Sequence, residues 1–318
     1  MSGARPLLSV VLSFRNEEEV LPELVARLAK ALGGEALDYE LLFVNDASTD
    51  HSLAVLEAER ASNPRIKIVT MSRRFGVAPC VMAGMELARG DAVAYMDADL
   101  QDPPELLPEL VARWREGAEV VYTVRTARRG ESAAKRLITR AAYRLIRLAS
   151  EIELPIEAGD FKLLSRRALD RLLELPEREL YMRGLVAWVG FRQVAVPYER
   201  APRAAGHSHF PLLRSWGPAR SFAAALTSFS HAPLLAFLVL GAAGCALSLG
   251  ALVAVALLRA AGIAWPHGAG LVAFALLLWA TLALGIGSIG LYLARIHREV
   301  LGRPRYVIES TIGFDERA

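Results

Sequence analysis

The stretch Asp91-Ala-Val-Ala-Tyr-Met-Asp-Ala-Asp-Leu-Gln101 joins a short apolar run to a cluster of oxygen-bearing side chains. Residues 92–96 have the length and composition of a buried strand, which ends at Asp97. Asp97 and Asp99, one residue apart at a strand end, can turn toward one divalent cation, and Gln101 offers a third oxygen. Mg²⁺ and Mn²⁺ prefer such oxygen ligands and often share them with the phosphates of a substrate. An isolated Asp-x-Asp is also a common solvated turn, so its meaning depends on the rest of the chain.

Strand-like and helical patterns alternate over the first part of the chain. Apolar runs of strand length are separated by helical runs, and a short loop joins each pair. This order predicts an α/β fold with a mostly parallel sheet flanked by helices on both faces. Ligands bind such sheets at the carboxyl ends of the strands, and polar clusters follow the predicted strands here. These clusters are residues 13–17, 45–46, 72–75 and 97–101.

The second cluster has a competing structural explanation. The Ser-Thr-Asp sequence at 48–50 supplies good N-cap residues for a helix predicted at about 52–62. Capping does not explain Asn45 and Asp46, which come before the cap. These two residues therefore remain candidates for ligand binding.

Apolar residues are concentrated late in the chain. The 318 residues are 53% hydrophobic, and the mean hydropathy of +0.30 is too high for an ordinary soluble enzyme. Residues 234–258 and 271–294 each approach or exceed the ~20 residues needed to span a bilayer, and neither contains Lys, Asp or Glu. Arginines follow the second run, so the positive-inside rule predicts a cytoplasmic tail. Two spans then place the N-terminal domain on the same side.

Two further segments are predicted to contact the membrane surface. Residues 133–150 carry apolar side chains at helical spacing with Lys and Arg between them, which is typical of an amphipathic helix on an anionic membrane. A surface helix packed on its own domain would show the same pattern. Residues 211–232 combine aromatic and arginine residues, as interfacial helices do. The predicted parts are a cytoplasmic catalytic domain (1–210), interfacial helices (211–232), a two-helix transmembrane hairpin (233–294) and a cytoplasmic tail (295–318).

Missing motifs exclude several functional classes. No Gly-x-Gly-x-x-Gly follows the first strand and no Walker-type Gly-Lys-Ser/Thr occurs, which argues against a dinucleotide oxidoreductase and a P-loop ATPase. Cys80 and Cys245 belong to no Cys-x-x-Cys motif, so neither a disulfide framework nor a zinc site is expected. A metal-held nucleoside diphosphate that releases a sugar fits the polar clusters better, with the cation acting as a Lewis acid on the departing diphosphate.

Several stretches in order carry a family resemblance that covers nearly the whole chain. The chain resembles the membrane-anchored glycosyltransferase family 2 enzymes that load a sugar onto a polyprenyl phosphate. It looks most like bacterial undecaprenyl-phosphate glucosyltransferases, with dolichyl-phosphate mannose synthases as relatives. The stretches include Asn16-Glu-Glu, Phe43-Val-Asn-Asp-Ala-Ser-Thr-Asp50, Met96-Asp-Ala-Asp-Leu-Gln-Asp-Pro-Pro-Glu105, Ala158-Gly-Asp-Phe161, Val196-Pro-Tyr-Glu-Arg200 and Gly302-Arg-Pro304.

The resemblance implies a GT-A-like fold and inverting transfer from a nucleotide sugar, with UDP-glucose or another UDP-hexose as the expected donor. Asp97, Asp99 and Gln101 match the motif that binds Mg²⁺ or Mn²⁺ together with the diphosphate. Arg125 matches a diphosphate contact and is grouped with Asp99 and Asp160 as catalytic. The implied donor-binding residues are Phe14, Glu17, Asn45, Asp46, Arg73 and Asp97.

The acceptor half of the implied site begins in a loop predicted at 154–162. Its Asp160 matches the acidic residue placed near the acceptor, where it would orient the lipid phosphate or act as a base. A phosphate monoester is already largely ionised near pH 7, which favours positioning over proton abstraction. The implied contacts to the acceptor phosphate are Arg136, Arg203, Ser208 and His209.

The chain departs from the family pattern at several positions. Asn45-Asp-Ala-Ser48 stands where the family usually has Asp-Asp-Gly-Ser, which puts the base contact in question. His209 replaces a lysine expected near the acceptor loop, and an unperturbed histidine is mostly uncharged near neutral pH. Ser13 and Arg74 replace a proline and an asparagine.

The resemblance also implies the partners and the location. They are a nucleotide sugar, a polyprenyl phosphate and the lipid bilayer of a bacterial inner membrane, with both termini cytoplasmic and no nucleic acid. A homo-oligomer is expected, with a tetramer among the candidates. One alternative is a processive polysaccharide synthase, which would want a Gln-x-x-Arg-Trp motif that this chain lacks. The other is a non-catalytic, membrane-tethered sugar-nucleotide-binding protein, against which the acidic motif and Asp160 argue.

Overall fold

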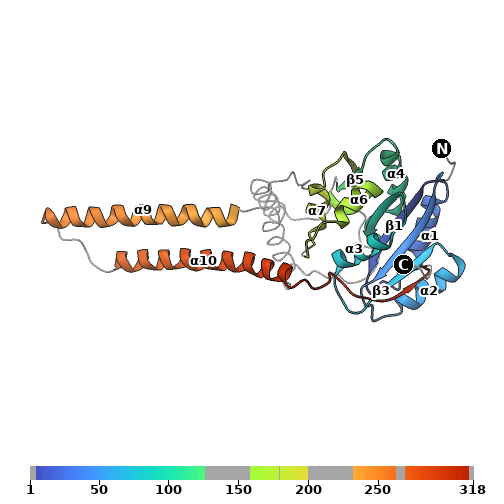
Figure 1. Cartoon of the computed structure of the whole chain (residues 1–318), viewed down its shortest axis with the longest axis horizontal. Helices are drawn as coiled ribbons and strands as arrows, with labels where there is room; N and C mark the ends of the chain where they lie inside the picture. Colours follow the sequence, from blue (N-terminus) through green and yellow to red (C-terminus); the bar gives the residue numbers. More distant parts are fainter. Residues whose placement is uncertain (1–4, 126–157, 179, 200–231, 263–268, 315–318) are drawn as a thin grey trace.

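The computed structural model describes residues 5–125, 158–178, 180–199, 232–262 and 269–314. Figure 1 shows a layered α/β domain from which two long helices, α9 and α10, extend side by side. The last segment of the chain returns from α10 to the domain and ends near α2.

A single sheet organises the domain, with strand order β7-β5-β6-β4-β1-β2-β3-β8 among the described residues. The neighbours β1–β2, β1–β4, β2–β3 and β5–β7 run parallel. The strand β6 runs antiparallel to both β4 and β5, and β8 runs antiparallel to β3. The strands are β1 (Leu7–Phe14), β2 (Asp38–Asn45), β3 (Ile66–Met71), β4 (Ala92–Asp97), β5 (Val120–Arg125), β6 (Ala158–Ser165), β7 (Gln193–Tyr198) and β8 (Ile308–Ile312).

Helices cover both faces of the sheet, as the alternating pattern predicts. In α1, Leu21, Leu24, Val25 and Leu28 recur at helical spacing and are buried, so this helix packs through one apolar stripe. One core cluster joins the sheet to α1 (Leu21–Leu32), α2 (Ser52–Ser62) and α4 (Leu107–Arg115), with the short 3-10 turn η1 (Pro104–Leu106) beside them. A second cluster joins the other face to α3 (Val77–Leu87), α6 (Arg166–Leu173) and α7 (Met182–Trp188). The predicted mostly parallel sheet flanked by helices is confirmed.

One prediction about local structure was wrong, and one strand was not predicted. Residues 158–162, expected within a loop, lie in strand β6, where Phe161 and Leu163 are buried on one face and Leu164 on the other. Two charged residues, Asp160 and Lys162, interrupt the apolar pattern and hid the strand. The segment predicted as a cytoplasmic tail supplies the edge strand β8, for which the sequence analysis made no prediction.

The helices α9 (Ala232–Ala260) and α10 (Ala269–Val300) are both long and apolar enough to cross a membrane. Their apolar side chains are exposed, as shown by Leu238 and Trp279 at 69% each. Gly285 of α10 lies next to Phe237 of α9, and a Cβ atom there would be in ordinary van der Waals contact with the ring, at 3.5 Å.

The end of α10 and the chain beyond it are fastened to the domain at several points. The carboxylate of Glu299 accepts a hydrogen bond from the backbone N–H of Arg178, at 2.9 Å for Oε1. Tyr306 donates its hydroxyl hydrogen to Glu86, and Lys67 lies over the ring of Phe314 at 5.1 Å. The end of the apolar hairpin is therefore held on the α/β domain by these contacts.

Candidate active site

Three of the predicted polar clusters meet at one edge of the sheet. The registers pair Ser13 with Asp97 across β1 and β4, and Phe14 with Asn45 across β1 and β2. Carboxyl ends of parallel strands share an edge, so the loops after β1, β2 and β4 are neighbours there. The structure thus brings together the donor-side residues singled out in the sequence.

The loop after β2 is ordered by its own polar side chains. Asn45 Oδ1 accepts a hydrogen bond from the backbone N–H of Ser48 at 2.8 Å. One carboxylate oxygen of Asp46 accepts from the N–H of Phe75 at 2.6 Å, and the other accepts from Gly76 at 3.0 Å. Asp46 therefore holds the loop after β3 in place, while Arg15 donates to the Asp46 carbonyl oxygen at 2.7 Å.

The capping explanation accounts for only part of the 48–50 segment. An Asp50 carboxylate oxygen accepts from the N–H of Ser52 at 3.1 Å, close to the start of α2. The Ser48 and Thr49 groups instead bind the loop after β1: Asn16 N–H donates to Ser48 Oγ at 3.1 Å, and Asn16 Oδ1 accepts from Thr49 N–H at 2.8 Å. These contacts connect the first two strand-end loops.

The remaining donor-side candidates differ in exposure. Phe14 is only 4% exposed and meets Phe43 edge-on, with ring centroids 6.4 Å apart, because it is the inward-facing last residue of β1. Arg73 is exposed and stacks on the ring of Phe75 at 4.0 Å. The backbone N–H of Glu17 donates to Ser52 Oγ at 2.8 Å. Arg73 is thus accessible to a ligand, whereas the Phe14 ring is committed to the core.

The acidic motif lies where β4 ends. Asp97 is half-buried, Asp99 is 7% exposed, and one oxygen of Asp99 accepts from the backbone N–H of Gln101 at 3.1 Å. In the described part of the chain no group of three or more His, Cys, Asp or Glu side chains could hold a metal. Mg²⁺ commonly takes one or two carboxylates and completes its shell with substrate phosphates. Two carboxylates here fit a cation that arrives with a diphosphate.

Asp160 lies on β6 and forms a forked ion pair with Arg183 of α7. Arg183 Nε donates to Oδ1 at 2.7 Å, and Nη2 donates to Oδ2. The antiparallel register pairs Tyr95 of β4 with Lys162 of β6. Continuing this register by two residues brings Asp160 to the end of β4, where Asp97 lies. The acidic residue predicted for the acceptor therefore reaches the same edge as the donor motif.

Two buried polar residues adjoin this ion pair. Lys162 is 2% exposed, and burial lowers its pKa to about 8, with the charge of Arg183 acting in the same direction and that of Asp160 opposing it. Burial also raises the pKa of the Tyr95 phenol, and the negative charges of Asp160 and Asp97 add to this. Sequence reasoning gave no role to Tyr95, Lys162 or Arg183. A lysine inside the apolar run 161–164 was the signal available.

Other predicted residues cannot be placed as fully. Arg125 is the last residue of β5, but its side chain is outside the described set. The acceptor-side residues Arg136, Arg203, Ser208 and His209 lie outside the described residues. So do the amphipathic segment 133–150 and most of the interfacial segment 211–232.

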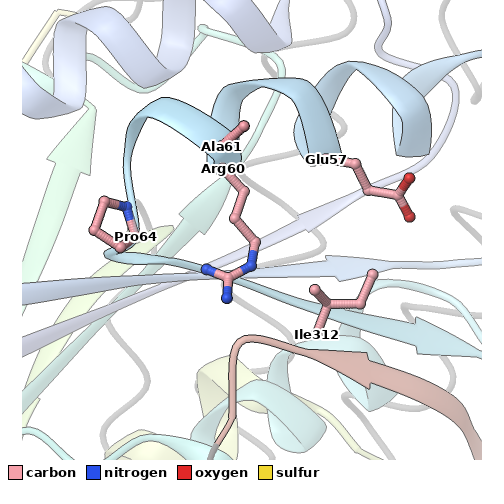
Figure 2. A pocket seen from close by; sticks show the side chains of 5 residues that line it. All are labelled: Glu57, Arg60, Ala61, Pro64 and Ile312. Atoms are coloured by element: carbon pink, nitrogen blue, oxygen red, sulfur yellow. The ribbon is translucent and has the colours of Figure 1, made fainter.

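A pocket of about 390 Å³ lies away from these strand-end loops. Figure 2 shows its lining, in which Arg60 reaches from α2 toward the strands; Glu57, Ala61, Pro64 and Ile312 complete it. Ile312 pairs with Ile68 near the start of β3, and Arg60 donates to the Ile66 carbonyl oxygen at 3.0 Å. The pocket therefore lies at the amino end of β3, opposite the candidate active site.

Comparisons with known proteins agree with this arrangement. The sequence profile of glycosyl transferase family 2 matches residues 9–173. "Uncharacterized glycosyltransferase YkcC" of Bacillus subtilis (strain 168) is 37% identical, over 97% of this chain and 95% of its own length. The "Bactoprenol glucosyl transferase" of Shigella phage SfII is 33% identical, over 96% of this chain and 98% of its own.

A solved structure shows a partial likeness. Glucosyl-3-phosphoglycerate synthase from Mycobacterium tuberculosis, in complex with Mn²⁺, UDP-glucose and phosphoglyceric acid, is 22% identical with a TM-score of 0.47. The match covers 70% of this chain and 79% of that one. The profile match and the relatives of nearly equal length establish the identity: the chain is a glycosyltransferase that belongs to glycosyltransferase family 2.

Proposed function

We propose that this glycosyltransferase transfers a hexose from a nucleoside diphosphate sugar, UDP-glucose being the first donor to test, to the phosphate of undecaprenyl phosphate. The observation that carries the proposal is the combination of a strand-end acidic site with an apolar two-helix hairpin in one chain. A polyprenyl phosphate cannot leave the membrane, so its glycosyltransferase must work beside the bilayer. The similarity to bactoprenol glucosyl transferases over nearly the full length supports this choice of acceptor.

The donor half of the site would use the loops after β1, β2 and β4. Asn45, Asp46 and Glu17 would contact the uridine and its ribose, and Arg73 lies in the loop that Asp46 orders. Asp97 and Asp99, with Gln101, would hold Mg²⁺ or Mn²⁺ on the diphosphate. When bound, the cation supplies Lewis acidity to the departing diphosphate, and Arg125 would add a positive charge there.

The acceptor half would centre on Asp160. Both of its carboxylate oxygens accept hydrogen bonds from Arg183, which supports a positioning role over proton abstraction. The lipid phosphate is largely ionised near neutral pH and can attack without a base. Arg136, Arg203, Ser208 and His209 are the proposed further contacts to that phosphate, and direct displacement would invert the anomeric carbon.

The membrane arrangement is part of the same proposal. α9 and α10 would span a bacterial inner membrane, with the α/β domain and both termini in the cytoplasm. The segments 133–150 and 211–232 would lie at the membrane surface, and a homo-oligomer would pack through the hairpin and tail. Reporter fusions at residue 318 and in the loop between the two spans test this topology: cytoplasmic and periplasmic signals, respectively, are expected, and the reverse would refute it.

The direct test uses the purified full-length protein with undecaprenyl phosphate, Mg²⁺ and a panel of radiolabelled sugar nucleotides. The expected product is undecaprenyl phosphate carrying a single sugar, formed from one preferred donor. A long polymer would instead indicate a processive synthase. No lipid-linked sugar from any donor, while nucleotide binding persists, would support a non-catalytic binding protein and overturn the proposal.

A further inference from the structure

The lysine beneath the Asp160–Arg183 ion pair has no role in the function proposed so far. Side chains alternate along a strand, so Asp160, Lys162 and Leu164 of β6 face the same side. Leu164 packs in the core cluster that contains residues of α6 and α7. The side chains of Arg183 and Asp160 retain 30% and 36% exposure, whereas Lys162 retains 2%. The lysine therefore lies deeper than the ion pair and on its inner side.

A buried ammonium needs a compensating interaction. Removing a charge from water is costly, and an apolar residue would fill the same strand position without that cost. Among the groups that act on Lys162, Asp160 favours the charged form, while burial and Arg183 disfavour it. Asp160 is thus shared between two cations, one accessible and one fixed in the core.

The forked ion pair with Asp160 occupies the guanidinium N–H groups of Arg183 that could otherwise bind an incoming phosphate. Guanidinium groups bind phosphate and carboxylate with the same forked geometry, so one Arg183 cannot serve both fully at once. A bare Asp160 carboxylate would also repel a phosphate dianion. Lys162 offsets the negative charge of Asp160, so the carboxylate would repel the phosphate less once Arg183 turns away.

We propose that Arg183 exchanges Asp160 for the phosphate of the acceptor lipid, and that Lys162 is the fixed counter-cation of Asp160 that permits this exchange. The identity of the acceptor rests on the function proposed above. Tyr95 provides a second, independent observation beside Lys162. Its hydroxyl is buried and has no hydrogen-bond partner within the described ranges, so the arrangement described here leaves a polar group of the same cluster unused.

Equilibrium binding of undecaprenyl phosphate to the purified full-length protein tests the exchange, with undecaprenol as the lipid that lacks the phosphate. Arg183→Met should weaken binding of undecaprenyl phosphate about tenfold or more, the usual effect of losing a charge-assisted hydrogen bond. Binding of undecaprenol and of UDP should change little. Arg183→Lys, which keeps the charge but not the fork, should lie between wild type and Arg183→Met.

Lys162→Met should also weaken binding of undecaprenyl phosphate about tenfold, because Arg183 then stays on Asp160. Asp160→Asn removes the need for a counter-cation, so Lys162→Met should have little further effect in that background. A lysine that only supports the fold, or attracts phosphate at long range, would weaken binding equally in both backgrounds. Lys162→Gln provides a second, polar replacement in case Lys162→Met misfolds. The melting temperature of each variant shows whether it is folded.

Unchanged binding in Arg183→Met overturns the inference, and so does an equal loss from Lys162→Met in both backgrounds. A wild-type protein that does not distinguish undecaprenyl phosphate from undecaprenol overturns it as well. The proposed function fails separately, if the wild type shows Arg183-dependent lipid binding yet transfers no sugar. Sugar transfer together with Arg183-independent binding would refute the exchange alone.

Discussion

Tyr198, the last residue of β7, donates its hydroxyl hydrogen to the carboxylate of Asp102, which is fully buried. Asp102 lies three residues after Asp99, so this bond ties the loop of the acidic motif to the strand at the far end of the sheet. The chain continues from Tyr198 toward the acceptor-side residues predicted at 203–209. One hydrogen bond therefore connects the loop of the acidic motif with the strand that precedes the residues proposed to contact the acceptor.

Tyr198→Phe should loosen the acidic loop and lower both stability and donor affinity. A hydrogen bond to a charged group contributes about 1.5–3 kcal/mol, so a clear fall in melting temperature is expected. The dissociation constant for UDP in the presence of Mn²⁺, measured by titration calorimetry, should rise. Tyr39→Phe, which removes a hydroxyl from half-buried Tyr39 of β2, is the matched control and should leave that constant unchanged. An unaffected Tyr198→Phe protein would show that the bond does not order the loop.

Tyr95→Phe should have the opposite effect on stability. The Tyr95 hydroxyl is buried without a hydrogen-bond partner in the described part of the protein, a situation that costs roughly 1–3 kcal/mol. Replacing it with an apolar edge should raise the melting temperature of the substrate-free protein. Thermal unfolding followed by intrinsic fluorescence, with Tyr198→Phe alongside, makes the comparison. A fall in melting temperature for Tyr95→Phe would mean that the hydroxyl is hydrogen-bonded in the folded protein.

Part of the sheet could be predicted from the sequence, and part could not. The strands β1 to β4 are apolar runs buried on both faces. Their positions along the chain, and the polar clusters at their ends, could therefore be predicted. Strand β6 could not be predicted, because Asp160 and Lys162 are charged and interrupt the apolar pattern of a buried strand. The edge strand β8 carries exposed Glu309, Ser310 and Thr311, which give no apolar signal.

In the candidate active site, too, some residues could be predicted from the sequence and others could not. Asp97 and Asp99 lie at the end of the strand that positions them, so their place at the edge of the sheet could be predicted. The contact between Asp160 and Arg183 depends on the antiparallel placement of β6 and on the position of α7. Long-range pairs of this kind follow from sheet topology, which residue patterns alone do not specify.

Lys162 should give the protein a specific dependence of stability on pH. Its pKa falls from 10.5 to about 8 on folding, so the unfolded chain binds a proton that the folded one lacks between these values. The free energy of unfolding should therefore rise with pH through this window, by roughly 3 kcal/mol from this group. The cost of the buried charge is fully present below about pH 8.

Melting temperatures of the wild type and Lys162→Met, measured in parallel from pH 7 to 10.5, isolate this contribution, since other titrating groups are common to both. The variant should be relatively most stable at pH 7, and its advantage should shrink as pH rises. A difference that stays constant with pH would show that Lys162 titrates normally.

Asp99→Asn should abolish sugar transfer while the fold is retained. Asparagine keeps an oxygen for the N–H of Gln101 but loses the charge that a hard cation requires. Loss of metal Lewis acidity is worth several kcal/mol, so the rate should fall by at least about a hundredfold. Glu109→Gln, on the exposed surface of α4, is the control and should be fully active. EDTA should stop the wild-type reaction and Mn²⁺ should restore it; transfer that persists in EDTA would refute the metal assignment.

Removal of residues 307–318 should destabilise the domain by uncovering the edge of β3. Strand β8 pairs with Ile68, Val69 and Thr70, and an exposed strand edge invites pairing with other chains. The truncated protein should melt at a lower temperature and form larger species on size-exclusion chromatography. Removal of residues 315–318 alone keeps β8 and Phe314, whose ring lies against Lys67, and should behave like the full chain. Equal behaviour of the two truncations would mean that β8 does not protect the sheet, and that the contacts of Glu299 and Tyr306 suffice to hold the end of α10 on the domain.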